Sequence, residues 1–247
     1  MQKRRLDLLL VERGLAPSRE RAQALILAGK VWVEGKRISK AGAQVLADAA
    51  IEITGKDIPY VSRGGVKLEA ALGAFNLDVT GLTCLDVGAS TGGFTDCLLK
   101  HGAKHVTAVD VGYGQLDWSL RNDPRVEVIE RTNIRHLDAG ALPHPVDLAC
   151  IDVSFISLKI VVPVVSQLIK QPANIICLIK PQFEVGKGMV GKGGVVRDPA
   201  LHDAVIKDLT AAFEGFKLRV LGIIPSPILG PKGNQEFLMH LELGIPA

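Results

Sequence analysis

Two charged residues directly follow apolar runs in this 247-residue chain: Asp152 closes one run and Lys180 closes the next. If both runs are parallel strands, the carboxylate and the amine lie at the same edge of a sheet, where open α/β sheets bind ligands. Lys67, on a helix before the first strand, and Glu236, which opens the last strand, can converge on that edge. Such a cluster can accept and hold protons. The alternative for each residue is an ordinary surface charge or ion pair.

A glycine-rich turn joins an apolar segment to a helix at residues 85–94 (LDVGASTGGF). The spacing is not the dinucleotide fingerprint G-x-G-x-x-G, because Ser90 stands where the second glycine belongs and the glycines fall as G-x-x-x-G-G. Asp110 ends the next strand, 22 residues after Gly88, where a carboxylate can bind both hydroxyls of an adenosine ribose. This combination favours S-adenosylmethionine over the alternative of a tight turn with a solvated Asp110. The candidate cofactor-binding residues are Asp86, Gly88, Ser90, Gly92, Gly93 and Asp110.

Residues 186–192 (GKGMVGK) match the first seven positions of the phosphate-binding pattern G-x-x-x-x-G-K-[ST]. Gly193, however, stands where the Mg²⁺-binding hydroxyl must be, and the segment does not join a strand directly to a helix. We therefore expect a mobile, substrate-facing loop rather than a nucleotide triphosphate site.

The elements that must position these residues are short apolar strands, most of them followed by helical stretches. This alternation predicts an α/β fold with a mostly parallel sheet that is covered on both faces. The expected strands are residues 83–88, 105–111, 126–130, 147–153 and 175–180, with a helix at 66–75 before them and a closing antiparallel pair at 218–224 and 236–243.

The first 60 residues read differently. Two short helices, near residues 6–13 and 18–29, precede a hairpin whose strands flank Glu34-Gly35, the spacing of a two-residue turn. A further strand is expected at 45–53 and a linker at 55–62. We therefore divide the chain into a small α+β domain with its linker, residues 1–60, and a larger domain, residues 61–247.

Positive charge is concentrated in the small domain. Residues 1–45 hold ten Lys and Arg against four Asp and Glu, whereas the whole chain has a net charge of only +3. Such a distribution favours a domain that binds a polyanion, with a solvated basic face as the alternative. The candidates for contacts with RNA phosphates are Lys3, Arg4, Arg5, Arg19, Arg21, Lys30, Lys36 and Arg37.

Composition excludes several classes of protein. With 47% apolar and 22% charged residues the chain is globular, and its longest uncharged stretch, residues 220–231, is too short to span a membrane. No cleavable leader pattern follows the basic N-terminus, so we expect a cytoplasmic protein. The four cysteines are widely spaced, which predicts buried free thiols rather than disulfides or a metal site.

The motifs together resemble a known family. Lys67, Asp152, Lys180 and Glu236 occur in the order of the Lys-Asp-Lys-Glu tetrad of FtsJ-like ribose 2′-O-methyltransferases. The chain is similar to the TlyA (hemolysin A) family over essentially its whole length, through residues 62–68, 88–96, 111–116, 131–133, 152–158, 180–186 and 193–196. Residues 18–22 and 29–35 are similar to the alpha-L RNA-binding domain.

The resemblance implies a Rossmann-like, S-adenosylmethionine-dependent methyltransferase fold with a seven-stranded sheet, and 2′-O-methylation of cytidine in ribosomal RNA. It adds Asn133 to the cofactor-binding residues. We expect neutral Lys180 to accept the ribose proton and Lys67 to favour that neutral form. Asp152 would orient Lys180, Glu236 would hold Lys67, and no metal would be needed.

Two features depart from the family pattern: the linker at 57–61 has a different sequence, and the chain ends soon after its last strand. The second departure favours large-subunit RNA as the substrate, with small-subunit RNA as the alternative. Other functions to weigh are a non-catalytic RNA-binding or ribosome-assembly factor, a membrane-active hemolysin and an NAD-dependent dehydrogenase. Methyl transfer would separate the enzyme from the first of these.

Overall fold

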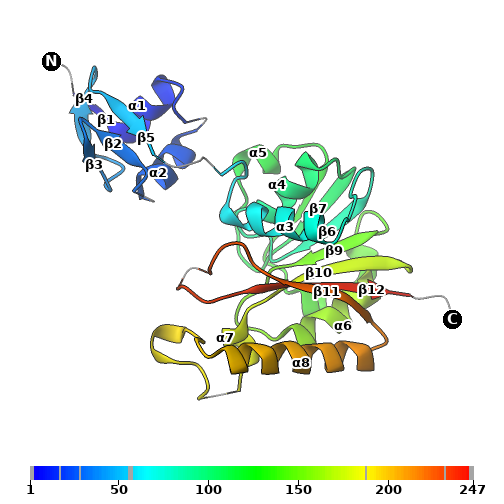
Figure 1. Ribbon diagram of the computed structural model, residues 1–247. Coiled ribbons are helices and arrows are strands. Elements are labelled where there is room, and N and C mark those ends of the chain that lie inside the picture. The colour runs from blue at the N-terminus through cyan, green and yellow to red at the C-terminus, as the bar shows by residue number, and fades with distance from the viewer. Residues whose placement is uncertain are drawn as a thin grey trace. The chain divides into compact units, whose positions relative to one another are not determined.

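The computed structural model describes residues 3–16, 18–27, 29–54, 58–186, 188–230 and 232–244. The chain forms two compact units, Met1–Asp57 and Ile58–Ala247, which Figure 1 shows in blue and in cyan to red. Residues 55–57 of the expected linker lie outside the described residues. Each unit is built around a core of its own.

The first unit combines two helices with short strands. Its elements are β1 (Lys3–Arg5), α1 (Leu6–Glu12), α2 (Arg19–Leu27), β2 (Val31–Val33), β3 (Lys36–Arg37), β4 (Gln44–Leu46) and β5 (Ile51–Ile53). Strands β3, β2 and β5 form one antiparallel sheet, and β1 pairs with β4. The hairpin turn is the expected one, because Glu34 and Gly35 both have the positive φ that a two-residue turn of type I′ requires.

The prediction of a single strand at residues 45–53 is wrong. The segment forms two strands, β4 and β5, which belong to different sheets. Between them the backbone turns, and the Ala49 amide donates to the Leu46 carbonyl at 3.1 Å. Strand β1 was not predicted, because Lys3–Arg5 is uniformly charged and gives no alternating pattern.

The second unit contains a seven-stranded sheet. Its strands are β6 (Thr83–Val87), β7 (His105–Val109), β8 (Val126–Ile129), β9 (Leu148–Ile151), β10 (Ala173–Ile179), β11 (Arg219–Pro225) and β12 (Phe237–Leu243). The order is β11-β12-β10-β9-β6-β7-β8. Strands β6 to β10 are parallel, whereas β12 runs antiparallel to both β10 and β11. The predicted fold class and the closing antiparallel pair are confirmed.

Helices cover both faces of this sheet (Figure 1). Helices α3 (Arg63–Ala74) and α4 (Gly93–Lys100) pack on one face, with Leu68 and Leu98 fully buried. Helices α6 (Leu158–Leu168) and α8 (Pro199–Gly215) pack on the other, with Leu158 and Phe213 in the core. The short elements are α5 (Trp118–Arg121), α7 (Pro181–Glu184) and the 3₁₀ turns η1 (Ile134–His136), η2 (Ala139–Ala141) and η3 (Lys192–Gly194).

Helix α3 begins three residues earlier than predicted, at Arg63 rather than Val66. Ser62 adopts an extended backbone, and its hydroxyl accepts a hydrogen bond from the Gly64 amide at 3.3 Å. This is the N-cap interaction that favours serine before a helix. The early start matters because it brings Ser62 and Arg63 to the pocket described below.

All four cysteines, Cys84, Cys97, Cys150 and Cys177, are buried and free, as the sequence predicts. Burial raises the pKa of the Cys84 thiol well above its usual value, so the thiol stays protonated near neutral pH. Within the described residues, no helix has both the length and the apolar character needed to cross a membrane.

Candidate active site

The candidate site lies where the strand order reverses. From β6 the chain continues to β7 and β8 on one side, whereas β9 and β10 lie on the other. Ligands of open α/β sheets bind outside the carboxyl ends of the strands at such a reversal. A pocket of about 210 Å³ opens here, and its walls include Asp86 from β6 and Asp152, which follows β9. A second pocket of about 830 Å³ shares Gly88, Ser90 and Asp152 with the first.

Lys180 and Asp152 meet at this edge. The Lys180 Nζ lies 2.6 Å from Asp152 Oδ1 and donates a hydrogen bond to Ser154 Oγ at 3.0 Å. Their side chains are 12% and 21% exposed, so the pair is reachable from solvent but mostly shielded. Neighbouring parallel strands thus bring an amine and a carboxylate together, which is the arrangement that proton transfer requires.

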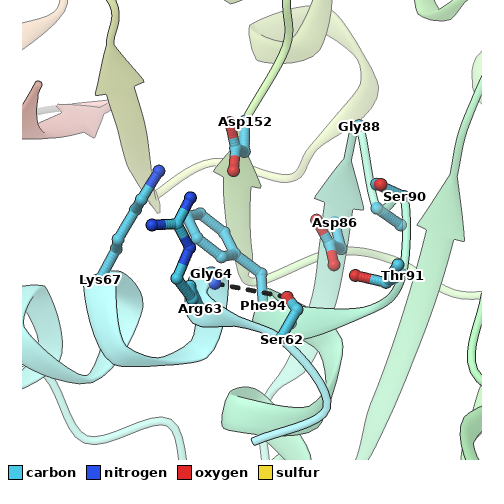
Figure 2. A pocket seen from close by; sticks show the side chains of 12 residues that line it. Ser62, Arg63, Gly64, Lys67, Asp86, Gly88, Ser90, Thr91, Phe94 and Asp152 are labelled. Carbon is cyan, nitrogen blue, oxygen red and sulfur yellow. Dashed lines mark hydrogen bonds between the residues drawn. The ribbon is translucent and has the colours of Figure 1, made fainter. Parts of the chain in front are cut away.

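A second ion pair lies deeper. Lys67 Nζ, from α3, lies 2.5 Å from Glu236 Oε2, and the Glu236 side chain is completely buried. A Cβ on Gly230 would lie only 2.3 Å from Glu236 Oε1, so a residue without a side chain is needed there. Figure 2 shows Lys67 and Asp152 pointing into the smaller pocket. Lys180 and Glu236 are each bound to one of these residues but do not line that pocket.

Asp86 is a fully buried acid in the pocket wall. Its Oδ2 accepts hydrogen bonds from the Thr95 amide at 2.9 Å and the Thr95 hydroxyl at 2.7 Å. Its Oδ1 has no hydrogen-bond partner among the described residues. Burial raises the pKa of Asp86 to about 7, although the bonds from Thr95 oppose the shift. The carboxylate therefore offers an unused acceptor to a cationic or hydrogen-bonding ligand.

The glycine turn makes close backbone contacts possible. Gly88 has a φ of +85°, and a Cβ there would lie 2.5 Å from the carbonyl oxygen of Asp152. A Cβ on Gly93 would lie 2.2 Å from Ser62 Oγ. Gly92 is different: it lines neither pocket, and a Cβ there would meet Leu120 Cδ1 at 2.3 Å. The structure therefore places Gly88 and Gly93 at the pocket and Gly92 behind it, against α5.

Asp110 and Asn133 line the larger pocket. Asp110 accepts hydrogen bonds from the Ser90 amide at 2.8 Å and the Gly112 amide at 2.6 Å. It is therefore a structural tie between two loops as well as a pocket residue, and each of its oxygens keeps a further lone pair. Asn133 Oδ1 accepts from the Arg135 amide at 3.1 Å and caps η1, so its side-chain NH₂ group is free of that bond.

Several pocket residues were not identified from their own sequence signals. Ser62, Arg63 and Gly64 line the smaller pocket (Figure 2), and Ser154 accepts a hydrogen bond from Lys180. A capping serine before two glycines and a lysine-bearing helix was the available signal for the first group. Ser154 stands two residues after Asp152 on the same turn, and this spacing was the available signal for the second.

The cationic residues of the first unit are not equally free. Arg5 donates two hydrogen bonds to the buried Asp7, at 3.0 and 2.8 Å, and Arg19 donates a third at 3.1 Å. The bonds from Arg5 are the main reason why the pKa of Asp7 lies far below its usual value. Arg4 pairs with Glu12 at 3.6 Å. The remaining candidates divide into Lys3, Lys36 and Arg37, which are exposed, and Arg21 and Lys30, which are partly buried.

The glycine-rich segment after α7 does not form a phosphate loop. Gly191 pairs with Val195 in an isolated bridge. Asn234 accepts a hydrogen bond from the Val196 amide at 2.9 Å and donates one to the Gly194 carbonyl at 3.0 Å. These contacts tie the segment to the turn before β12. The expectation that the loop is mobile and faces the substrate stays a prediction, and Lys187 lies outside the described residues.

Comparisons with known proteins agree with this architecture. Residues 60–243 match the FtsJ-like methyltransferase family and residues 4–51 match the S4 domain. The chain is 49% identical over 239 residues to the 16S/23S rRNA (cytidine-2′-O)-methyltransferase TlyA of Mycobacterium tuberculosis, covering 96% of this chain and 89% of that protein. It is 41% identical to Hemolysin A of Brachyspira hyodysenteriae, covering 96% and 98% of the two chains.

Solved structures give the same picture. A candidate hemolysin from Streptococcus thermophilus superimposes with a TM-score of 0.78 at 42% identity, over 99% of this chain and 90% of that one. The N-methyltransferase NodS from Bradyrhizobium japonicum has a TM-score of 0.51 at 14% identity, over 74% and 95% of the two chains, and supports the fold alone. These matches agree with the Lys180–Asp152 and Lys67–Glu236 pairs and the glycine turn of the site. The chain belongs to the TlyA group of FtsJ-like methyltransferases.

Proposed function

We propose that this chain is an enzyme that methylates the ribose 2′-hydroxyl of cytidine in ribosomal RNA, with S-adenosylmethionine as the methyl donor. The observation that carries the proposal is the Lys180–Asp152 pair at 2.6 Å, beside the pocket that contains Asp86. The substrate is the one named for the TlyA of Mycobacterium tuberculosis, which is 49% identical to this chain. Ribosomal RNA or a ribosomal subunit in the cytoplasm is then the partner.

The residues present fit the proposed cofactor. The buried Asp86 Oδ1 lacks a partner among the described residues, and it suits the ammonium group of a methionine moiety. Asp110 suits the ribose hydroxyls. Gly88 and Gly93 let the backbone of the glycine turn pack closely against Asp152 and Ser62, which line the same pocket. When bound, S-adenosylmethionine supplies an electrophilic methyl group on a sulfonium. Asp86 and Asp110 accept hydrogen bonds from backbone amides. Among the described residues, no Lys or Arg forms an ion pair with either carboxylate and competes with the cofactor for it.

The chain's own residues handle the proton. A ribose hydroxyl is too weak an acid to ionise appreciably at neutral pH, so a base must accept its proton during attack. In the proposed mechanism the Lys180 ammonium of the Asp152 pair first releases a proton to solvent, and the neutral Nζ then takes the ribose proton. Asp152 and Ser154 stabilise the ammonium that forms, because both already contact the nitrogen. Lys67, which is held by Glu236, lines the smaller pocket together with Asp152 and orients the ribose.

The proposed function is tested by incubating the purified protein with labelled S-adenosylmethionine and unmodified ribosomal subunits. Large and small subunits are assayed separately, and the modified position is mapped. We expect a 2′-O-methyl group on a cytidine. Label on a base, or no label on either subunit, contradicts the proposal. Retained RNA binding without transfer would indicate the non-catalytic assembly factor.

Cofactor affinity should depend on pH through Asp86. Because the folded-state pKa is about 7, the carboxyl group loses its charge as the pH falls below that value. An ammonium ligand prefers the charged form, so affinity should weaken by up to about tenfold per pH unit below pH 7. Calorimetry with S-adenosylmethionine between pH 6 and 8 measures this slope. The variant Asp86→Asn should bind weakly with a flat profile, and equal affinity of the wild type at pH 6 and 8 contradicts the assignment.

The raised pKa of Asp86 also affects the free energy of unfolding, but this decreases with rising pH whereas cofactor affinity increases. A carboxyl whose pKa is raised on folding binds its proton more tightly in the folded state, so stability falls as the pH rises from about 4 to about 7. The ligand-free Asp86→Asn variant should therefore be more stable than the wild type at pH 8, by up to about 4 kcal/mol. Urea unfolding at pH 5 and pH 8 gives the comparison, and the gain should be smaller at pH 5.

The first unit should contribute salt-dependent RNA affinity. Lys36 and Arg37 are exposed on β3, so their removal costs the fold little. The variant Lys36→Ala/Arg37→Ala should weaken RNA binding and reduce the slope of log K against log salt concentration by about 2, since each phosphate contact contributes about one unit. Lys104→Ala/Lys207→Ala, with two exposed lysines of the second unit, is the control. An equal slope in both variants contradicts the role of the first unit.

A further inference from the structure

The turn after β9 and the helix after β10 are joined at three places, and the proposed mechanism uses only the first. Lys180 contacts Asp152 and Ser154. Farther along, the rings of Phe155 and Phe183 lie 4.9 Å apart. At the far end, Glu184 of α7 binds the start of α6. The third contact has no role in the chemistry described above.

Glu184 receives two hydrogen bonds from the segment that follows Asp152. Its Oε2 accepts from the Ser157 hydroxyl at 2.6 Å, and its Oε1 accepts from the Leu158 amide at 2.9 Å. The Leu158 amide belongs to the first turn of α6, where amides lack partners within the helix. A negative charge is also favourable at a helix N-terminus. Ser157 is the N-cap of α6, because its hydroxyl accepts from the Lys159 amide at 3.2 Å. Glu184 adds a second capping group, which comes from outside the helix.

The environment of Glu184 keeps these bonds shielded. Burial raises its pKa, while the bonds from Leu158 and Ser157 oppose the shift. The other charged groups that act on it are Lys159 and Asp208, and these two form an ion pair with each other. The carboxyl group is therefore engaged by α6 rather than by a cation of its own.

The turn that Glu184 holds is strained. Phe155 has a φ of +63° and a side chain that is 90% exposed. A bulky residue rarely adopts this left-handed conformation, and it persists only where the surroundings impose it. The turn is fixed at one end by the Asp152 amide, which donates to the Val87 carbonyl at 2.9 Å. Glu184 fixes the other end through Ser157 and Leu158.

We propose that Glu184 is a positioning residue for methyl transfer: it holds the turn from Asp152 to Ser157 so that Lys180 stays between Asp152 and Ser154. This inference rests on the proposed function, because it gives Lys180 the role of proton acceptor. The hydrogen bonds of Glu184 go to Ser157 and Leu158, not to Asp152 or Lys180. Its effect passes through the backbone of the turn.

The test compares Glu184→Ala with Glu184→Gln in the full-length protein. Glu184→Ala removes both bonds, and kcat should fall by up to about 10²-fold, the cost of a misplaced catalytic group. KM for the RNA and the affinity for S-adenosylmethionine should stay near their wild-type values. Glu184→Gln keeps a carbonyl acceptor for Leu158 and an amide group that can donate to Ser157, so it should restore most of kcat.

Asp78→Ala is the matched control. It removes a carboxylate that accepts the Thr80 amide at 2.9 Å, before the amino end of β6 and thus at the opposite edge of the sheet, and it should leave kcat unchanged. Hydrogen exchange adds a direct measurement, since the Leu158 amide should exchange faster in Glu184→Ala. If that variant does not fold, Ser157→Ala removes one of the two bonds, together with the hydrogen bond that the Ser157 hydroxyl accepts from the Lys159 amide at 3.2 Å, and should give a smaller loss of kcat.

The outcomes separate this inference from the proposed function. If Lys180→Ala is inactive but folded Glu184→Ala, or Ser157→Ala in its place, turns over like the wild type, the positioning role is wrong and the function stands. If kcat of Glu184→Gln is as low as that of Glu184→Ala, the hydrogen bonds of Glu184 do not position the turn, and the inference fails. If the wild type transfers no methyl group to either subunit, the proposed function fails and the inference with it.

Discussion

Lys180→Ala should reduce methyl transfer by about 10² to 10⁴-fold, the range over which a positioned base accelerates proton transfer. The amine contacts Asp152 and Ser154 and lies outside the lining of the smaller pocket. Affinity for S-adenosylmethionine should therefore stay nearly unchanged, because its proposed contacts come from the glycine turn, Asp86 and Asp110. Single-turnover kinetics and calorimetry on the same preparation measure the two quantities separately.

The chain offers a matched control for this variant. Lys170 forms an ion pair with Asp147, which stands just before β9, so the pair lies at the amino edge of the same sheet. Lys170→Ala removes a lysine from a Lys–Asp pair without approaching the pocket, and its turnover should equal that of the wild type. Turnover retained in Lys180→Ala, or lost equally in both variants, would remove Lys180 from the role of base.

Lys67→Met should lower the free energy of unfolding of the second unit by about 3 to 5 kcal/mol, the cost of leaving one member of a buried ion pair without its partner. Glu236 is completely buried, and its other oxygen has no partner among the described residues, so the carboxylate would face the core uncompensated. Urea unfolding followed by circular dichroism measures the loss.

A double variant separates stability from catalysis. Lys67→Met/Glu236→Gln removes both charges and keeps the shape of the buried side chain beside Gly230, where space is tight. Most of the lost stability should return, because a buried pair replaced by neutral groups is often as stable as the original. Methyl transfer should stay low, since the pocket has lost the Lys67 amine. Recovery of activity together with stability would show that Lys67 acts only in folding.

The sequence predicted which residues meet at the carboxyl edge of the sheet, but not the contacts that surround them. Asp152 and Lys180 could be placed together because each ends an apolar run, and the ends of parallel strands share one edge. The Lys67–Glu236 contact joins residues 169 positions apart. Their positions suggested only that both could reach this edge, and the expectation that Glu236 holds Lys67 came with the resemblance to a family tetrad. Single-sequence patterns carry no information on which distant helix faces which strand.

The glycines show a different limit. The pattern G-x-x-x-G-G marks a tight turn, but it does not say which glycine faces a ligand. Gly88 and Gly93 line the pocket, whereas Gly92 makes room for Leu116 and Leu120. In the first unit the apolar residues from Val45 to Ile53 suggested one strand, because the turn that divides them is short and made partly of alanine. Packing and turn geometry, not local composition, decided both cases.

The position of β12 has a consequence for the order in which the sheet is completed during synthesis. The strand lies between β10 and β11 and begins directly after Glu236, so a place inside the sheet is filled by a segment that is synthesised after both of its neighbours. Until that strand inserts, β10 and β11 cannot be bridged and Lys67 lacks its counter-charge. The sheet therefore cannot be completed, and Lys67 cannot be paired, before translation has passed residue 243.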